Sequence, residues 1–188
     1  MTGDPWHGLR MEGHRLYLRP VRPEDATQRY VEWLNDPQTT RFLETSGRQT
    51  IKTVQEYINR YQGRKDALFL AIVLREGDRH IGNVKLEPID WHHRHATLGI
   101  MIGEASARRR GIGTEAIVLL LGFAFEKLGL HRVSLGVTAD NVAALRCYRK
   151  VGFVEEGRLR ESHWCGGHWV DGIWMGILEH EFRARHGR

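Results

Sequence analysis

The sequence has little cysteine and no long apolar run. Cys147 and Cys165 are too few for a disulfide scaffold, and their spacing matches no metal site, so we expect both to be reduced and no metal to be bound. The longest apolar run, residues 116–125, contains Gly122 and is too short to span a bilayer. Residues 1–10 lack the apolar centre of a signal peptide. These absences predict a cytoplasmic protein with no membrane partner.

The sequence also lacks internal repeats, low-complexity linkers and two glycine-rich nucleotide fingerprints, Gly-x-x-x-x-Gly-Lys-Ser/Thr and Gly-x-Gly-x-x-Gly. Its 188 residues, with 41% hydrophobic and 27% charged residues, are typical of one soluble globular domain. The formal net charge of +5 suits an anionic partner. A nucleic acid and an anionic cofactor satisfy that charge equally well, so charge alone does not choose between them.

The spacing of apolar residues predicts a mixed α/β (α+β) fold in one domain. Strands are predicted over residues 14–21, 67–75, 79–88, 96–103, 131–137, 153–161 and 169–179. Helices are predicted over residues 23–35, 50–62, 111–128 and 142–150. We expect a central, twisted and mostly antiparallel sheet of six to seven strands with helices on both faces.

One stretch, residues 96–116, joins a predicted strand, a glycine-containing loop and the start of a predicted helix. The loop reads Arg108-Arg109-Arg110-Gly111-Ile112-Gly113. Backbone N–H groups and the positive end of a helix dipole gather around such a loop, which suits a phosphate. A lone Gly-x-Gly loop is more often a plain turn, and three arginines also suit a solvated turn. A second signal is therefore needed.

That signal lies downstream. Asn141 and Tyr148 are seven residues apart, which places them two helical turns apart on one face, and Gly152-Phe153 follow. The loop and this block together resemble the Gcn5-related N-acetyltransferase (GNAT) family. The family's loop pattern is Gln or Arg, two residues of any type, Gly, any residue, then Gly or Ala. Its second block is Asn, a short helix with Tyr, then Gly-Phe.

The resemblance extends from about residue 14 to residue 182 and implies an acetyltransferase domain over residues 13–183. Residues 1–12 and 184–188 are then expected to be tails. Residues 18–20 and 33–37 look like those of a subgroup that acetylates ribosomal-protein N-termini, polyamines or amino sugars. Residues 81–86 and 99–103 resemble the amino-sugar enzymes most. The resemblance also implies splayed middle strands in the sheet.

The resemblance implies acetyl-CoA as the cofactor, bound without a metal. The strand around Ile100, Met101 and Ile102 is expected to offer backbone N–H groups to the acetyl carbonyl and to pantetheine. Asn141 is expected to bind pantetheine or to hold the splay, and it also suits a helix N-cap. The other cofactor-binding residues that we expect are Arg108, Arg109, Arg110, Gly111, Ile112, Gly113, Thr114, Ala144 and Tyr148.

Acetyl transfer from a thioester to an amine needs a neutral amine and a proton for the leaving thiolate. An aliphatic amine has a pKa of about 10 and a thiol of about 8.5, so a base helps the first event and an acid the second. By resemblance, Tyr148 is the acid. A core tyrosine that packs beside Phe153 is the structural alternative.

The base is less clear from the sequence. Several members of the family carry a glutamate on the strand before the second block, but the matching residue here is Gly136. Alignment with ribosomal-protein acetyltransferases implies His163 or Glu161 instead, and a histidine with an ordinary pKa of about 6.5 suits the task. Glu87 and Glu104 remain alternatives. His163 is equally compatible with a surface strand.

Three further groups have open interpretations. Trp164, Trp169 and Trp174 suit either an acceptor pocket or the core. The histidines of residues 92–95 form a solvated turn by their spacing, not a metal site. Cys147 is expected in the core.

The sequence therefore predicts an acetyl-CoA-dependent N-acetyltransferase that acts by direct transfer on a primary amine of a small molecule or a protein N-terminus. The alternatives are a non-enzymatic acyl-CoA sensor and a nucleotide- or RNA-binding module. The presence of both Asn141 and Tyr148 argues against the sensor, and we expect no nucleic-acid partner. Glu32, Asp36 and Glu44 suit attraction of a polyamine or a basic N-terminus, although such residues more often lie on a solvated face. An amino-sugar nucleotide is an equally suitable acceptor. Exposed strands near the C-terminus leave a homodimer open.

Overall fold

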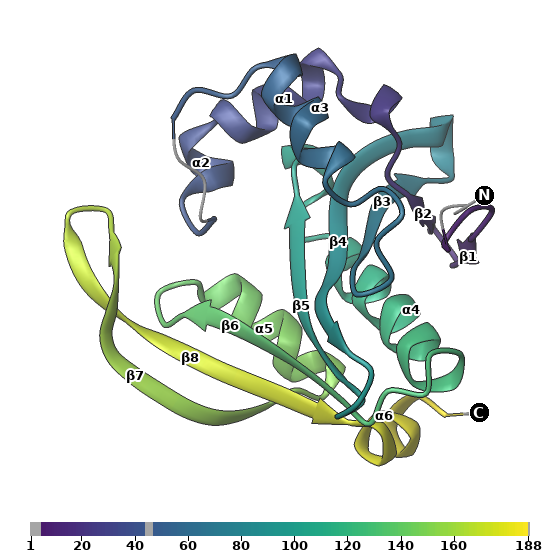
Figure 1. The fold of residues 1–188 in the computed structure, drawn as a ribbon. Helices are drawn as coiled ribbons and strands as arrows, with labels where there is room; N and C mark the ends of the chain where they lie inside the picture. Colours follow the sequence, from purple (N-terminus) through teal and green to yellow (C-terminus); the bar gives the residue numbers. More distant parts are fainter. Residues whose placement is uncertain (1–4, 44–46, 188) are drawn as a thin grey trace.

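An eight-stranded sheet organises the chain in the computed structural model, which describes residues 5–43 and 47–187 (Figure 1). Its strands lie in the order β1-β2-β3-β4-β5-β6-β8-β7, and every neighbouring pair is antiparallel except β5 and β6. The mostly antiparallel mixed fold is therefore confirmed. The strands are β1 Met11–Glu12, β2 Leu16–Pro20, β3 Leu68–Leu74, β4 Arg79–Asp90, β5 His95–Ile102, β6 Arg132–Thr138, β7 Val154–Cys165 and β8 His168–Leu178.

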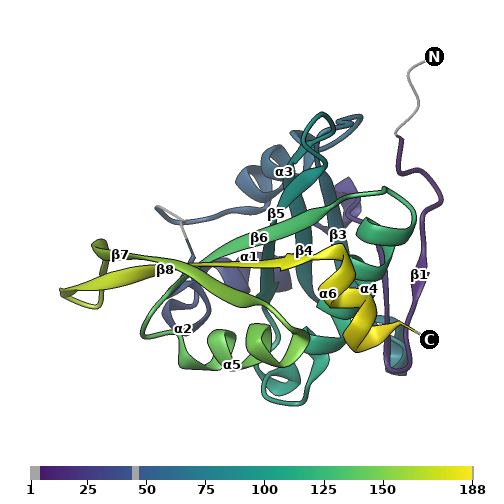
Figure 2. The ribbon, with the colours of Figure 1, turned by 90° about the horizontal axis from the view of Figure 1, so that it is seen from below.

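Helices cover both faces of this sheet, as predicted. Helices α1 and α3 lie over one face, and α4, α5 and α6 lie over the other (Figures 1 and 2). The helices are α1 Gln28–Asn35, α2 Pro37–Thr40, α3 Ile51–Asn59, α4 Ile112–Glu126, α5 Val142–Val151 and α6 Glu179–His186. Short 3-10 turns occupy Pro23–Asp25, Glu76–Asp78 and Ala105–Ala107.

Strand β3 shows why two helical layers are needed. All seven of its residues are apolar and buried. Leu68, Leu70 and Ile72 belong to the core beneath α4, whereas Phe69 and Ala71 belong to the core beneath α1 and α3. A strand that is buried on both faces reads as a continuous apolar run, because neither side needs polar residues.

The ends of the domain differ from the sequence prediction. Met11 of β1 pairs with Leu18, so a strand lies where a loose tail is expected, and the sheet gains an eighth strand. The indole of Trp6 donates a hydrogen bond of 2.8 Å to the carbonyl of Ala67. Two strand residues are too few to show an alternating pattern. Helix α6 likewise occupies much of the predicted C-terminal tail.

The first predicted helix is divided in two. A 3-10 turn holds Pro23–Asp25, and α1 starts only at Gln28 after Thr27, whose side chain accepts a hydrogen bond from the N–H of Tyr30. The Asp25 carboxylate is occupied by Arg19 and by the N–H of Arg22, which closes the turn. The proline and the two acids at residues 23–25 therefore begin a 3-10 turn and not the predicted helix, and α1 has a separate N-cap, Thr27.

Strands β5 and β6 separate partway along the sheet. They pair only through His95 with Arg132, Ala96 with Val133, and Thr97 with Ser134. Beyond these pairs β5 continues beside β4, and β6 continues beside β8. The splayed middle strands are confirmed. The facing edge of β5 from Leu98 to Ile102 keeps backbone groups that no strand satisfies.

Strands β7 and β8 form a long hairpin arm that extends away from the body of the domain (Figures 1 and 2). Strand β7 is exposed along most of its length. Its register with β8 shifts between Leu159 and His163, where residues 160–162 lie opposite Asp171 alone. Such a bulge bends a strand. The arm curves toward the side on which α2 lies (Figure 1).

Candidate active site

The predicted phosphate loop has the backbone that a phosphate requires. Gly111 is the N-cap of α4 with φ 76°, and Arg109 has φ 59°. The first turn of a helix leaves its N–H groups without intrahelical partners, here those of Ile112, Gly113 and Thr114. These donors and the helix dipole point out of the N-terminus, toward the end of β5.

The three arginines of the loop are not equivalent. Arg108 donates to the carbonyls of Ile102 and Gly103, at 3.0 and 2.9 Å, and to the hydroxyl of Thr39 at 2.6 Å. Its guanidinium thus joins the end of β5 to α2. The side chains of Arg109 and Arg110 are exposed. From the sequence, all three arginines are expected to attract a phosphate by their charge. The sequence does not reveal that Arg108 also links the end of β5 to α2.

Arg15 and Glu115 fix the start of α4, and sequence reasoning does not detect them. The Glu115 carboxylate accepts hydrogen bonds of 2.8 Å from both the backbone N–H and the Nε of Arg15. Arg15 also donates to the carbonyl of Arg110 at 2.7 Å. Burial opposes ionisation of Glu115, but the bonds from Arg15 hold its pKa below the ordinary value. An acid in the first turn of a helix is the only local signal.

Gly113 offers a test of cofactor binding that leaves the fold intact. A Cβ at this position would meet Ile100, Ile102 and Cys147 at 3.9 to 4.0 Å, which is ordinary contact. Gly113→Ala is therefore expected to keep the melting temperature of the free protein. If a pyrophosphate lies against this backbone, the methyl group displaces it, and the KM for acetyl-CoA rises by about tenfold, or about 1.4 kcal/mol. An unchanged KM would exclude close approach here.

Helix α5 lies beside the loop and carries the second sequence block. Asn141 is its N-cap and accepts a hydrogen bond of 3.2 Å from the N–H of Ala144. The hydroxyl of Thr114 and the thiol of Cys147 are 3.3 Å apart, so α4 and α5 touch at this point. Burial raises the pKa of the Cys147 thiol, which packs at the edge of the core. The capping role of Asn141 leaves its amide N–H groups available to a ligand.

Tyr148 is 7% exposed and packs edge-on against Phe153, with ring centroids 5.9 Å apart. Burial raises the pKa of its hydroxyl above the ordinary value. Among the described residues the hydroxyl has no hydrogen-bond partner. Tyr148 is thus both a core residue and a protonated donor at neutral pH. The two interpretations from the sequence are compatible.

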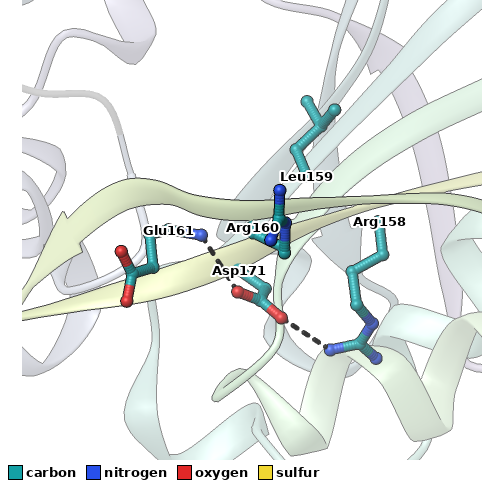
Figure 3. Close-up of a pocket in the computed structure, with 5 residues that line it drawn as sticks. All are labelled: Arg158, Leu159, Arg160, Glu161 and Asp171. Atoms are coloured by element: carbon teal, nitrogen blue, oxygen red, sulfur yellow. Dashed lines mark hydrogen bonds and ion pairs between the residues drawn. The ribbon is translucent and has the colours of Figure 1, made fainter.

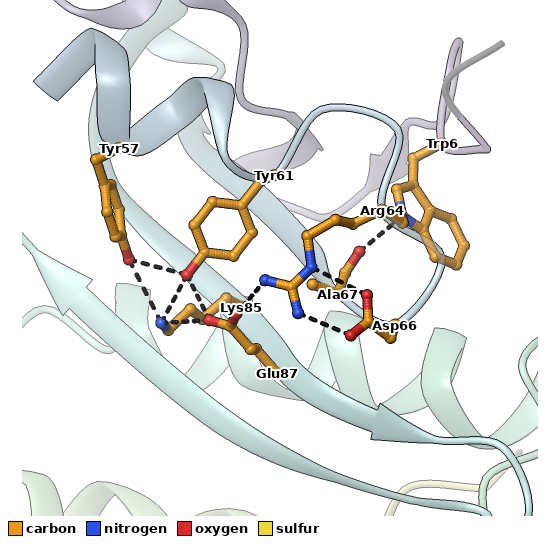
Figure 4. A network of polar contacts seen from close by, with 8 residues as sticks. All are labelled: Trp6, Tyr57, Tyr61, Arg64, Asp66, Ala67, Lys85 and Glu87. Carbon is orange, nitrogen blue, oxygen red and sulfur yellow. Dashed lines mark hydrogen bonds and ion pairs between the residues drawn. The ribbon is translucent and has the colours of Figure 1, made fainter. Parts of the chain in front are cut away.

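Among the alternative bases, Glu87 is already engaged. It accepts hydrogen bonds from Tyr61, Arg64 and Lys85 (Figure 4). Burial favours its neutral form, but these bonds hold the pKa of Glu87 below its usual range. A carboxylate stabilised in this way is a poor proton acceptor. Glu104 accepts a hydrogen bond of 3.3 Å from the hydroxyl of Ser106.

Glu161 lies on the bulge of the arm, and His163 is the first paired residue after it. Glu161 is exposed, has φ 49°, and its carboxylate points away from Asp171 (Figure 3). The bulge pocket, lined by Arg158, Leu159, Arg160, Glu161 and Asp171, is a wide surface hollow of about 790 Å³. His163 instead lies over Gly172, where an added Cβ would come within 2.8 Å of its Cε1.

One face of strands β6 and β8 contributes no residue to either hydrophobic core in the described part of the chain. Leu135, Ile173 and Met175 point to the core beneath α4, so Gly136, Thr138, Gly172 and Trp174, which alternate with them, share the opposite face. We call these four residues the open face. A Cβ at Gly136 would have no atom within 4 Å. The missing glutamate of the family pattern therefore leaves open space on this face.

The three tryptophans are not core residues. Trp164, Trp169 and Trp174 are 60%, 57% and 45% exposed. Trp164 and Trp169 form an edge-on pair at the tip of the arm, with centroids 5.1 Å apart. The core alternative is wrong because the arm leaves the body of the domain. Only Trp174 lies near the splay, on the open face.

The acidic residues predicted to attract a polyamine have other positions. Asp36 caps α2 and accepts hydrogen bonds from the backbone of Gln38 and Thr39. Glu32 is exposed on α1, and Glu44 lies outside the described residues.

In residues 5–43 and 47–187, no group of three or more His, Cys, Asp or Glu side chains is placed to hold a metal ion. Within the same ranges no helix is both long and apolar enough to cross a membrane.

The family model described as "Acetyltransferase (GNAT) domain" matches residues 15–154. The chain belongs to the GNAT acetyltransferase family. The spermidine N(1)-acetyltransferase of Escherichia coli K12 is 30% identical over 92% of this chain and 91% of its own length. An uncharacterised N-acetyltransferase of Bacillus subtilis, YoaA, is 31% identical over 84% of this chain and 89% of its own.

The fold of a solved GNAT structure agrees with that of this chain. The spermidine N-acetyltransferase of Vibrio cholerae, solved with CoA and spermine, has a TM-score of 0.81 and 25% identity over 89% of this chain and 98% of its own. This GNAT protein is thus an N-acetyltransferase that uses acetyl-CoA and transfers the acetyl group to an amine. The free N–H groups at the start of α4 and along β5 fit that cofactor.

Proposed function

We propose that the protein acetylates a primary amine of a small aliphatic polyamine, with the acceptor bound on the open face. Asp140 carries this proposal. Its Oδ1 is buried without a hydrogen-bond partner, while its Oδ2 lies 3.4 Å from the guanidinium of Arg41. The side chain is 24% exposed, so its negative charge attracts an ammonium group at the surface. Because Arg41 follows α2, the carboxylate faces the side of the splay on which α2 lies.

Thr138 adds a second polar group at this place. It is 8% exposed, and its Oγ1 has no partner among the described residues. Trp174, on the same face, has a ring that suits contact with an alkylammonium. The names of the relatives support the same acceptor class, since the Escherichia coli protein is a spermidine acetyltransferase and the Vibrio cholerae structure contains spermine.

The proposed proton transfers use two side chains on opposite faces of the sheet, Tyr148 in the core and His163 over Gly172. His163 accepts the proton of the acceptor ammonium, which makes the amine nucleophilic. Acetyl-CoA supplies the thioester, held by the N–H groups of β5 and the α4 loop. Tyr148 donates its hydroxyl proton to the departing thiolate, and the second proton that the nitrogen loses as the amide forms restores the tyrosine. The residues that we propose to bind the cofactor are Ile100, Met101, Ile102, Arg108, Arg109, Arg110, Gly111, Ile112, Gly113, Thr114, Asn141, Ala144 and Tyr148.

The acceptor class is tested by measuring thiol release from acetyl-CoA with spermidine, spermine, peptides with free N-termini and amino sugars. We expect turnover with the polyamines. Turnover confined to peptides or amino sugars would contradict the proposal. Asp140→Asn, which keeps the shape and removes the charge, is expected to raise the KM for spermidine by about tenfold, or about 1.4 kcal/mol. Asp90→Asn, at the far end of β4, is the matched control.

A further inference from the structure

The bulge in the arm is held in one conformation by Asp171. Its carboxylate accepts the N–H of Glu161 at 3.0 Å and pairs with Arg158 at 3.2 Å (Figure 3). Residues 160–162 are thereby looped out opposite a single residue of β8. As a result, the backbone of His163, the first paired residue after the bulge, is held at one position opposite Val170.

The imidazole of His163 lies over Gly172 because that residue has no side chain. A Cβ there would be 2.6 Å from Ser162 Oγ, 2.8 Å from His163 Cε1 and 3.1 Å from His163 Nδ1. Gly172 belongs to the open face and is paired with Thr138 of β6. Both Ser162 and His163 therefore lie against the open face, on which we place the acceptor.

Two contacts of Ser162 bear on the tautomer of this ring. The Ser162 hydroxyl donates to the carbonyl of Leu159 at 3.2 Å, and a carbonyl can only accept. Ser162 Oγ also lies 2.9 Å from His163 Nδ1. Because the hydroxyl has a single proton, both contacts can be hydrogen bonds at the same time only if that proton goes to Leu159 and Nδ1 carries a proton of its own. In a neutral imidazole, Nε2 then carries the lone pair.

We propose that Ser162 is a positioning residue that holds His163 as the Nδ1–H tautomer, with Nε2 as the proton acceptor on the open face. The inference rests on the proposed function, in which His163 is the base. Nε2 has no protein partner in the described part of the chain. Of the neighbouring charged groups, Asp171 is paired with Arg158 and Asp140 with Arg41, while Arg160 and Glu161 lie on the bulge itself.

The tautomer is measured directly by nitrogen-15 NMR of the histidine-labelled protein at alkaline pH, where the ring is neutral. The signal of His163 is identified by its loss in His163→Gln. We expect Nδ1 to be protonated in the wild type and in Ser162→Thr, and both tautomers to be populated in Ser162→Ala. A wild-type ring protonated at Nε2, or a Ser162→Ala spectrum equal to that of the wild type, would overturn the inference.

Steady-state kinetics separate this inference from the proposed function. Ser162→Ala is expected to lower kcat about tenfold with little change in the KM for either substrate, and Ser162→Thr to restore it. His163→Gln is expected to lower kcat about 100-fold. His168→Gln, an exposed histidine at the tip of the same arm, is the matched control. A wild-type kcat in His163→Gln would show that His163 is not the base, and the proposed role of Ser162 would then be wrong as well. Loss of kcat in His163→Gln with an unchanged tautomer in Ser162→Ala would refute only Ser162.

Discussion

Tyr148→Phe is expected to lower kcat by about 100-fold, the scale of losing one general acid, and to change the affinity for acetyl-CoA far less, because the ring that we place beside the cofactor remains. The substitution removes only the hydroxyl. The ring remains packed against Phe153 in the core, so the splay and the start of α5 keep their geometry. The measurement combines steady-state kinetics with the shift in Tm that acetyl-CoA produces, since a ligand of the native state raises Tm.

Tyr30→Phe provides the matched control for this prediction. Tyr30 is also a buried tyrosine, 2% exposed, and burial raises its pKa as it does that of Tyr148. It lies in the other core, beneath α1. The kcat of the Tyr30→Phe variant is expected to stay near the wild-type value. Wild-type kcat in Tyr148→Phe would eliminate Tyr148 as the acid. A lost Tm shift would mean that the hydroxyl acts mainly in binding the cofactor.

Asp25→Ala is expected to reduce the free energy of unfolding by about 3 kcal/mol at neutral pH. Asp25 is 8% exposed and accepts hydrogen bonds of 2.7 and 2.6 Å from the two terminal nitrogens of Arg19. Removing one partner of a buried ion pair leaves the other charge uncompensated. Urea denaturation of the two proteins measures the difference, with Cm as the readout.

The loss in Asp25→Ala is also expected to depend on pH. Burial opposes ionisation of Asp25, but its bonds to Arg19 and to the N–H of Arg22 hold its pKa below the ordinary value. A carboxyl whose pKa is lowered by folding stabilises the native state above its unfolded pKa, about 3.9, and loses that effect as the pH falls further. The wild type and the variant are therefore expected to converge in acid.

Asp66→Ala is the control for the ion pair. Its side chain is 54% exposed and pairs with Arg64 at 2.8 Å. Exposed pairs contribute about 0 to 1 kcal/mol, so this variant is expected to unfold close to the wild-type midpoint. Equal losses in the two variants would mean that burial of Asp25 adds nothing to its pair with Arg19.

The sequence predicts the cofactor loop and the α5 block because their signals are local. Gly111 needs a left-handed backbone at a helix start, and Asn141 caps a helix that carries Tyr148 two turns later. The seven predicted strands are also present, since their apolar patterns are longer than a few residues. These features depend on neighbours in the chain, and a single sequence records them directly.

The contacts that brace the site are not predictable in the same way. Arg15 and Glu115 are 100 residues apart, and Arg108 reaches Thr39 across 69. Nothing in either local segment marks the partner. The sequence also does not reveal the bulge before His163. An alternating pattern shows which residues share a face, but not where several residues of one strand lie opposite a single residue of its partner. The bend that such a bulge gives the arm is equally hidden.

The separation of β5 from β6 has a consequence for residues that touch no ligand. The two halves of the sheet share only three residue pairs on this side, so hydrogen bonds do not set the width of the gap. Leu98, Leu135 and Leu145 pack in the core beneath it, and we expect their packing to set the width. Interior packing therefore controls the spacing of the two strands. A change of one methyl group in this layer is expected to change the affinity for acetyl-CoA, although the altered residue does not touch the cofactor.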